Sequence, residues 1–259
     1  MNYGLYLSAS GVLTNMYRQD VFANNLANTE TAGFKIDLPA IRQRDPQAIE
    51  GQFGGDVSQR LLERLGGGVL AGPQRISFAP APLQKTDNPL DVALTEENQF
   101  FALRVDNPRT GAAETQFTRD GRFTRNAAGE LVTVAGHRVL DVNDQPIVVP
   151  GDAPAEVDPA GRVIQGGAEV ARIQVAHVAD TDQLAKRGGN RFAFENAGAK
   201  QVVAQPDVQA GFIDSSGVYP IKALMQMIGA TKSVSGNAEM IRYHDMLMDR
   251  AVNTLGRLA

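Results

Sequence analysis

The chain reads Ala23-Asn24-Asn25-Leu26-Ala27-Asn28-Thr29-Glu30-Thr31-Ala32-Gly33-Phe34-Lys35 where its proline-free N-terminal stretch ends. Asn is a poor helix former, and three of the six residues 23–28 are Asn. Such side chains can bond to the backbone at a helix end or to a packed neighbour. Gly33 can take the positive φ that often follows a helix. The residues alone leave two interpretations open, a packing motif or an ordinary helix end followed by a turn.

The residues before this stretch predict a helix with an apolar stripe. The stripe advances in steps of four and three, a period of 3.5 that is typical of helices that pack on other helices. Small residues at 8–11 would let another backbone come close. The stripe consists of Leu5, Ala9, Val12, Met16, Gln19, Ala23 and Leu26.

The last part of the chain, residues 217–259, returns to helical spacing after Pro220. A helix over 220–258 would be about 57 Å long at about 1.5 Å per residue. Asp245 is a charged defect in its stripe, which is Ile221, Leu224, Ile228, Thr231, Val234, Ala238, Ile241, Asp245, Met248, Val252 and Leu255.

Neither terminal helix can bury its stripe alone. We expect the two stripes to face each other in a coiled-coil-like pair, with neighbouring molecules covering the rest. Packing of both helices on the middle of the chain is an equally open alternative. The expected helix-packing residues are Leu5, Val12, Leu13, Met16, Ile228, Ile241, Met248, Val252 and Leu255.

The middle of the chain reads as β structure. Residues 36–216 hold 12 of the 13 prolines, with turn signals mostly 8–12 residues apart, which indicates a sandwich or barrel. Strands are expected at 100–105 and 131–134, and Asp120-Gly121 signals a tight hairpin. The fold class is therefore α+β, with paired terminal helices and a central all-β domain. The expected segments are an N-terminal helix (1–35), a connection (36–75), a β-rich outer domain (76–216) and a C-terminal helix (217–259).

Composition excludes several function classes. A net charge of −4 gives no electrostatic basis for binding nucleic acid. The absence of cysteine excludes disulfides and thiolate metal sites. His137, His177 and His244 lack the spacing of metal ligands. No run of 18 apolar residues occurs, and the N-terminus makes a poor cleavable signal peptide. We therefore expect no catalytic residue, metal, cofactor or integral membrane segment.

The stretch 23–35 resembles the N-terminal signature of the flagellar axial proteins, the rod and hook subunits. That signature is a helix ending in Ala-Asn-Asn-Leu-Ala-Asn, then Thr, then Gly-Phe-Lys. Segments 87–94, 100–103, 117–123 and 129–136 resemble the family in the same order, so the resemblance covers nearly the whole chain. The chain departs from the family at Glu97-Asn98-Gln99, where a Gly-rich turn is usual, and near Lys232–Asn237.

The resemblance implies a structural subunit of the flagellar basal-body rod. Its terminal helices would line a tube and its β domain would lie outside, with other rod subunits and the flagellar export apparatus as partners. It would leave the cell by type III export without signal cleavage and polymerise in the periplasm. The expected assembly motif is Asn24, Asn25, Leu26, Ala27, Asn28, Gly33, Phe34 and Lys35.

Two alternatives remain beside this interpretation. Length and the 40–43 connection favour the proximal rod protein, and the distal rod protein is the alternative within the family. A secreted β-rich enzyme or glycan-binding module is the alternative from a different class. It would need a deep pocket with convergent polar groups.

Overall fold

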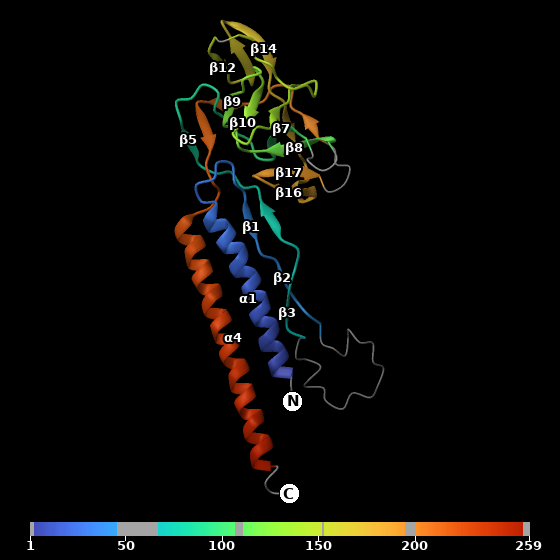
Figure 1. The fold of residues 1–259 in the computed structure, drawn as a ribbon, viewed down its shortest axis with the longest axis vertical. Coiled ribbons are helices and arrows are strands. Elements are labelled where there is room, and N and C mark those ends of the chain that lie inside the picture. The colour runs from blue at the N-terminus through green and yellow to red at the C-terminus, as the bar shows by residue number, and fades with distance from the viewer. Residues whose placement is uncertain (1–2, 46–66, 107–110, 152, 195–199, 256–259) are drawn as a thin grey trace. The chain divides into compact units, whose positions relative to one another are not determined.

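The computed structural model describes residues 3–45, 67–106, 111–151, 153–194 and 200–255. The protein is α+β, with an N-terminal helix, a central β-rich part and a C-terminal helix (Figure 1). It divides into two compact units. Unit 1 comprises residues 1–27, 37–75 and 220–259, and unit 2 comprises 28–36 and 76–219. Both units are therefore built from segments that are distant in the sequence.

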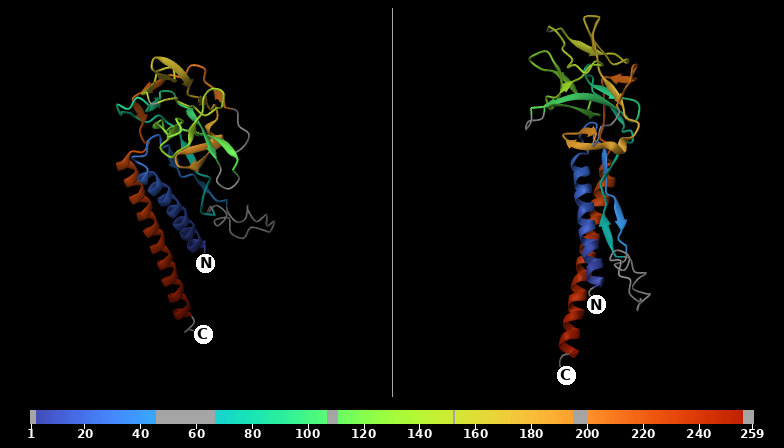
Figure 2. Two further views of the ribbon diagram at one scale, coloured as in Figure 1. Left: turned by 45° about the horizontal axis from the view of Figure 1, so that its top comes forward. Right: turned by 90° about the vertical axis from the view of Figure 1, so that its right-hand side faces the viewer.

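Unit 1 is a helix pair with short strands beside it. Helices α1 (Tyr3–Ala27) and α4 (Pro220–Leu255) lie side by side in Figures 1 and 2. Strands β2 (Ile41–Gln43) and β3 (Val69–Ala71) pair antiparallel. Pro220 opens α4 because the first helical position needs no N–H donor. The chain passes between the units four times: after α1 at 27/28, within β1 (Ile36–Leu38), within β4 (Arg75–Ser77), and before α4 at 219/220.

The two helices run antiparallel. A side-chain carbon added at Gly4 would lie 2.7 Å from the His244 ring, and one at Gly11 would lie 2.9 Å from the Asn237 amide. Gly4 and Gly11 are seven residues apart, as are Asn237 and His244, so the same spacing repeats along both helices. The absence of a side chain at these glycines lets the backbones approach closely.

Unit 2 is built around one main antiparallel sheet. Its order is β16 (Leu184–Gly188), β17 (Arg191–Phe194), β8 (Ala113–Thr118), β7 (Gln99–Asp106), β11 (Arg138–Val139), β10 (Leu131–Thr133) and β9 (Phe123–Arg125), with β15 (Val175–His177) on β7 and β18 (Gln201–Val202) on β15. Smaller sheets are β12 (Ala155–Val157), β13 (Arg162–Gln165) and β14 (Ala168–Arg172); β19 (Val208–Ala210) with β6 (Val92–Leu94); and β20 (Phe212–Asp214) with β5 (Leu83–Lys85). A short 3₁₀ turn, η1, spans Thr181–Gln183.

Strand β7 is the centre of the core because it is buried on both faces. Side chains alternate between the faces of a strand. Phe101 and Leu103 pack into a cluster with Phe123, whereas Phe100 packs on the other side against Phe192. The strands expected near 100–105 and 131–134 are confirmed as β7 and β10.

The hairpin expected at Asp120-Gly121 is wrong. Strand β8 pairs with β7 and β17, and β9 pairs with β10. A two-residue hairpin turn needs positive φ at one or both central residues, and the described residues with positive φ lie elsewhere. The Gly121 carbonyl instead accepts a 3.0 Å hydrogen bond from the Val92 amide, and no side chain would fit beside the Val92 carbonyl.

Candidate functional site

The motif segment, residues 23–35, begins in the last turn of α1. After Ala27 the chain makes two successive turns, in which the Thr31 amide donates to the Asn28 carbonyl and the Phe34 amide donates to the Thr31 carbonyl, each at 3.2 Å. The Thr31 hydroxyl also donates to the Asn28 side chain at 3.0 Å. The Asn side chain thus satisfies polar groups where the helix ends, as expected of an Asn in this position.

A glycine is required at position 33 because of its backbone conformation and because a side chain would not fit there. Its φ is +67°, a value that non-glycine residues rarely adopt. A carbon added to it would lie 2.5 Å from the Arg119 carbonyl carbon and 2.6 Å from the Asp120 nitrogen. The glycine of the motif therefore fits against the backbone that follows β8.

Asn25 joins α1 to the strand that follows. Its side-chain amide donates to the Asp37 carbonyl at 2.8 Å, and the Asp37 amide donates to the Asn25 side-chain oxygen at 2.9 Å. Asn25 is buried, whereas Asn24 and Ala27 are exposed and Leu26 is half-buried. The motif therefore contains residues that hold this fold together and others that remain on its surface.

Residues 28–36 are tied to the segment that precedes α4. The Gly33 amide donates to the Asp214 carbonyl at 2.7 Å, and the Gly217 amide donates to the Phe34 carbonyl at 2.9 Å. The Ser216 hydroxyl donates to the Asn28 carbonyl at 2.7 Å. Within unit 2, hydrogen bonds therefore connect the segment that follows α1 to the segment that precedes α4.

A buried charge cluster lies at this junction. Lys35 Nζ and Arg119 Nε both lie 3.1 Å from the same oxygen of Asp214, and the three side chains are between 1% and 3% exposed. Lys35 also donates to the Ala79 carbonyl at 3.1 Å. The Arg119 guanidinium donates to main-chain carbonyls of three further residues, Leu94, Glu96 and Gln99. Two cations thus share one carboxylate, and main-chain carbonyl groups accept further hydrogen bonds from both of them.

Burial is the main cause that lowers the pKa of Lys35 from 10.5, and the nearby Arg119 lowers it further, whereas Asp214 opposes the shift. A low pKa can mark a reactive lysine. Here the amine is 1% exposed and held by a carboxylate and a carbonyl, so no substrate can reach it. The cluster therefore acts as an internal tie. Lys186 extends it, since its amine donates to the Lys35 carbonyl at 2.8 Å and lies 4.1 Å from the centre of the Phe34 ring.

The two terminal helices pack side by side, as expected, but the predicted apolar stripes lie only partly at their contact. Leu13 and Met16 are 68% and 48% exposed, and Val252 is 68% exposed. Ile228 and Met248 are also exposed, whereas Leu5, Val12 and Ile241 are half-buried. The side chain of Leu255 lies outside the described part of the structure. Most of the large apolar residues of the stripes therefore remain on the surface of unit 1.

The helix contact instead uses the positions one residue before the predicted stripes. On α1 these are Gly4 and Gly11, which precede Leu5 and Val12. On α4 they recur every seventh residue, as Ala223, Ala230, Asn237 and His244. Glycine and alanine allow a short distance between the helix axes, and Asn237 and His244 fill the space that Gly11 and Gly4 leave. The spacing of glycine and alanine in the sequence indicates which positions form this contact, whereas the spacing of the large apolar residues does not.

Two other kinds of site are absent from the residues that the structure describes. These residues contain no group of three His, Asp or Glu placed to hold a metal ion. Within the same residues, no helix has the length and apolar character needed to span a membrane.

Two family models and several relatives match this chain. Residues 5–35 match the family described as flagella basal body rod protein, and residues 98–165 match the D1 domain of the flagellar hook protein FlgE/F/G family. The chain is 29% identical over 259 residues to the flagellar basal-body rod protein FlgF of Caulobacter vibrioides, with 100% of each chain covered.

Other relatives match over nearly their full length. The FlgF protein of Rhizobium meliloti is 30% identical over 259 residues, covering 99% of both chains. The flagellar basal-body rod protein FlgG of Bacillus subtilis is 28% identical over 268 residues, covering 96% of this chain and 97% of that protein. The chain therefore belongs to the flagellar basal-body rod protein family.

Proposed function

We propose that this structural rod subunit works by packing its terminal helices against those of neighbouring subunits in a tube that transmits torque. The observation that carries the proposal is the large apolar surface that both helices of unit 1 leave exposed. Monomeric soluble proteins rarely expose such contiguous surface. A subunit that repeats along a helical array covers it with copies of itself or with related subunits.

The packing residues of the proposal are the exposed large apolar residues of the two helices. Leu13, Met16, Ile228, Met248 and Val252 are exposed in the single chain, so neighbours can reach them. The exposed part of the motif, Asn24 and Ala27, would lie at the same contacts. We further propose that the antiparallel helix pair is coiled-coil-like, which the seven-residue spacing of its contact positions supports.

The four segments of the chain would then occupy different parts of the rod. Residues 1–35 and 217–259 would form the inner wall, 36–75 would connect it to the rest, and 76–216 would form the outer domain. We propose a proximal position in the rod, with a distal position as the alternative, since relatives bear the names FlgF and FlgG. Other rod subunits and the export apparatus would be the partners. Export would leave the N-terminal segment in place, because its residues belong to the packing surface.

The test compares charges placed on different surfaces. Leu13→Asp, next to the α1 stripe, and Ile228→Asp, on the α4 stripe, each put a carboxylate on an exposed apolar position, and we call them the stripe variants. Val134→Asp puts one on a position of unit 2 that is at least as accessible. Surface substitutions change folding stability by about 0.5 kcal/mol or less. Burying an unpaired charge at an assembled interface costs about 3 kcal/mol or more.

We therefore expect all three variants to fold, and both stripe variants to abolish rod assembly and swimming. Val134→Asp should support both. The measurements are circular dichroism of the purified proteins, electron microscopy of basal bodies, and swimming of a strain whose own copy is deleted. Full motility of both stripe variants would contradict the packing proposal.

A further inference from the structure

Helix α4 extends past the end of its partner. His244 lies opposite Gly4, next to the first described residue of α1, yet α4 continues to Leu255. The segment 245–255, which we call the α4 overhang, is about 16 Å long at about 1.5 Å per residue. Figure 1 shows α4 running beyond the N-terminal end of α1. Within the described residues of unit 1, no element continues alongside it.

The α4 overhang is an amphipathic segment with a strongly apolar surface. Leu247 is 62% exposed and Val252 is 68% exposed, and Met246 and Met248 are exposed as well. Asp249 and Arg250 are adjacent charges of opposite sign on the same segment. Methionine adapts its shape readily to a partner. The segment therefore carries the features of a helix that lies in a groove of another protein.

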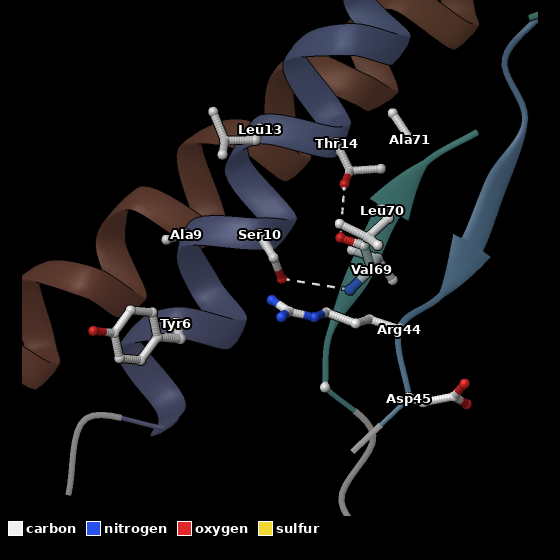
Figure 3. A pocket seen from close by; sticks show the side chains of 11 residues that line it. Tyr6, Ala9, Ser10, Leu13, Thr14, Arg44, Asp45, Val69, Leu70 and Ala71 are labelled. Carbon is white, nitrogen blue, oxygen red and sulfur yellow. Dashed lines mark hydrogen bonds between the residues drawn. The ribbon is translucent and has the colours of Figure 1, made fainter. Parts of the chain in front are cut away.

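A groove of matching character lies on the same unit. It has a volume of about 560 Å³ and runs between α1 and β3, and we call it the α1–β3 groove (Figure 3). Its apolar wall includes Tyr6, Ala9, Leu13 and Leu70. Arg44 and Asp45, again adjacent charges of opposite sign, lie at one side of it.

Hydrogen bonds connect the two walls of the groove. The Thr14 hydroxyl donates to the Val69 carbonyl at 3.3 Å, and the Val69 amide donates to the Ser10 hydroxyl at 3.5 Å (Figure 3). These bonds fix β3 against α1 without filling the space between them. Tyr6 and Leu13 are 69% and 68% exposed in the single chain, so an occupant of the groove would cover part of both side chains.

We propose that the α4 overhang of one copy binds in the α1–β3 groove of a second copy. This inference rests on the proposed packing function and specifies one of its contacts. The overhang cannot reach the groove of its own chain, because α4 is a continuous helix that runs past residue 244 away from Tyr6–Thr14. Asp249 and Arg250 of one copy would face Arg44 and Asp45 of the next. The contact joins two different surfaces, so it repeats along an array without closing.

The absence of native cysteine gives a direct test. Leu13→Cys is placed in one tagged full-length chain and Leu247→Cys in a second with a different tag. Both are expressed together in a strain lacking its own copy, and isolated basal bodies are oxidised. We expect a disulfide-linked dimer that carries both tags. Ala9→Cys with Val252→Cys serves as a second pair, which should also crosslink if the first pair disturbs packing.

Controls separate this inference from the proposed function. Val134→Cys paired with Leu247→Cys should give no dimer. Swimming cells whose basal bodies contain the variants but no crosslink from either pair would overturn the inference and leave the packing function standing. If the tagged wild-type chain never entered basal bodies, the proposed function itself would fail. Ser58→Cys combined with Leu13→Cys in one chain tests for an occupant from residues 46–66, and an intrachain crosslink there would also overturn the inference.

Discussion

At the scale of single residues, the burial of an ion pair decides how much its loss destabilises the fold. The pair Lys35–Asp214 and the pair Lys85–Asp87 have the same separation of 3.1 Å, yet the first is 1% exposed and the second is more than two-thirds exposed. Removing one partner of a buried pair leaves an uncompensated charge. Loss of an exposed pair costs little because water and salt screen it.

We therefore expect Asp214→Ala to lower the free energy of unfolding of unit 2 by about 3–5 kcal/mol, because Lys35 and Arg119 lose their shared carboxylate. Lys85→Ala should cost less than about 1 kcal/mol. Urea denaturation of the purified chain, followed by circular dichroism of the β structure, measures both changes. Equal losses in the two variants would show that the buried cluster does not stabilise unit 2.

The sequence identifies Lys35 and Gly33 as motif residues but does not assign their contacts. The partner of Lys35 is 179 residues away, and the third member of the cluster is a strand-end arginine with no local signal. Such contacts depend on how distant segments meet, and no spacing within 23–35 contains that information. The conformation of Gly33 was predictable, whereas the backbone it packs against was not.

At the scale of the elements, both terminal helices were predictable from their period, but their contact faces were not. The predicted stripes follow the large apolar residues, and the contact follows Gly4, Gly11, Ala223 and Ala230, one position earlier. A subunit of an assembly has two sets of contacts to encode, one within the chain and one between chains. Side-chain size separates the two sets only in part. Glycine and alanine lie at the contact within the chain, with Asn237 and His244 opposite the glycines, and most of the large apolar residues of the stripes are exposed.

We therefore predict that replacing glycine by leucine has opposite effects on stability at the helix contact and on the exposed surface of the helices. Gly11→Leu inserts a side chain where a single added carbon already lies 2.9 Å from Asn237. Overpacking of this kind costs about 1–3 kcal/mol. At Gly229 of α4 nothing lies within 4 Å, and leucine favours the helix over glycine by up to about 1 kcal/mol.

We expect Gly11→Leu to lower the temperature at which helical circular dichroism is lost, and Gly229→Leu to leave it unchanged or raise it. Thermal scans of the two purified variants beside the wild type measure both effects. Equal destabilisation by both substitutions would show that the helices do not approach through Gly11.

At the scale of the whole molecule, the two units differ in how much apolar surface they bury. Among the described residues of α1 and α4, the buried apolar side chains are Val21, Phe22, Ala223 and Ala230, whereas unit 2 buries extensive clusters on both faces of β7. Local stability follows buried apolar contact. In a monomer, amide exchange should therefore be much faster in α1 and α4 than in β7 and β8.

Hydrogen exchange followed by mass spectrometry tests this expectation on a sample shown to be monomeric by light scattering. Assembly into rods should then slow exchange in both helices, because neighbours cover their stripes. Full protection of α1 and α4 in the monomer would mean that unit 1 is stable without neighbours.

The tie between residues 28–36 and 214–217 also sets the order in which the chain can fold. Closing a loop of 179 residues costs roughly 4–5 kcal/mol of chain entropy, and that cost precedes any stabilisation from the contact it forms. Contacts this distant along the chain slow folding. A chain that emerges N-terminus first, from a ribosome or from a narrow channel, cannot complete this junction until more than four-fifths of its length is free. The junction between the two ends of unit 2 therefore forms late, and unit 2 cannot finish folding before it forms.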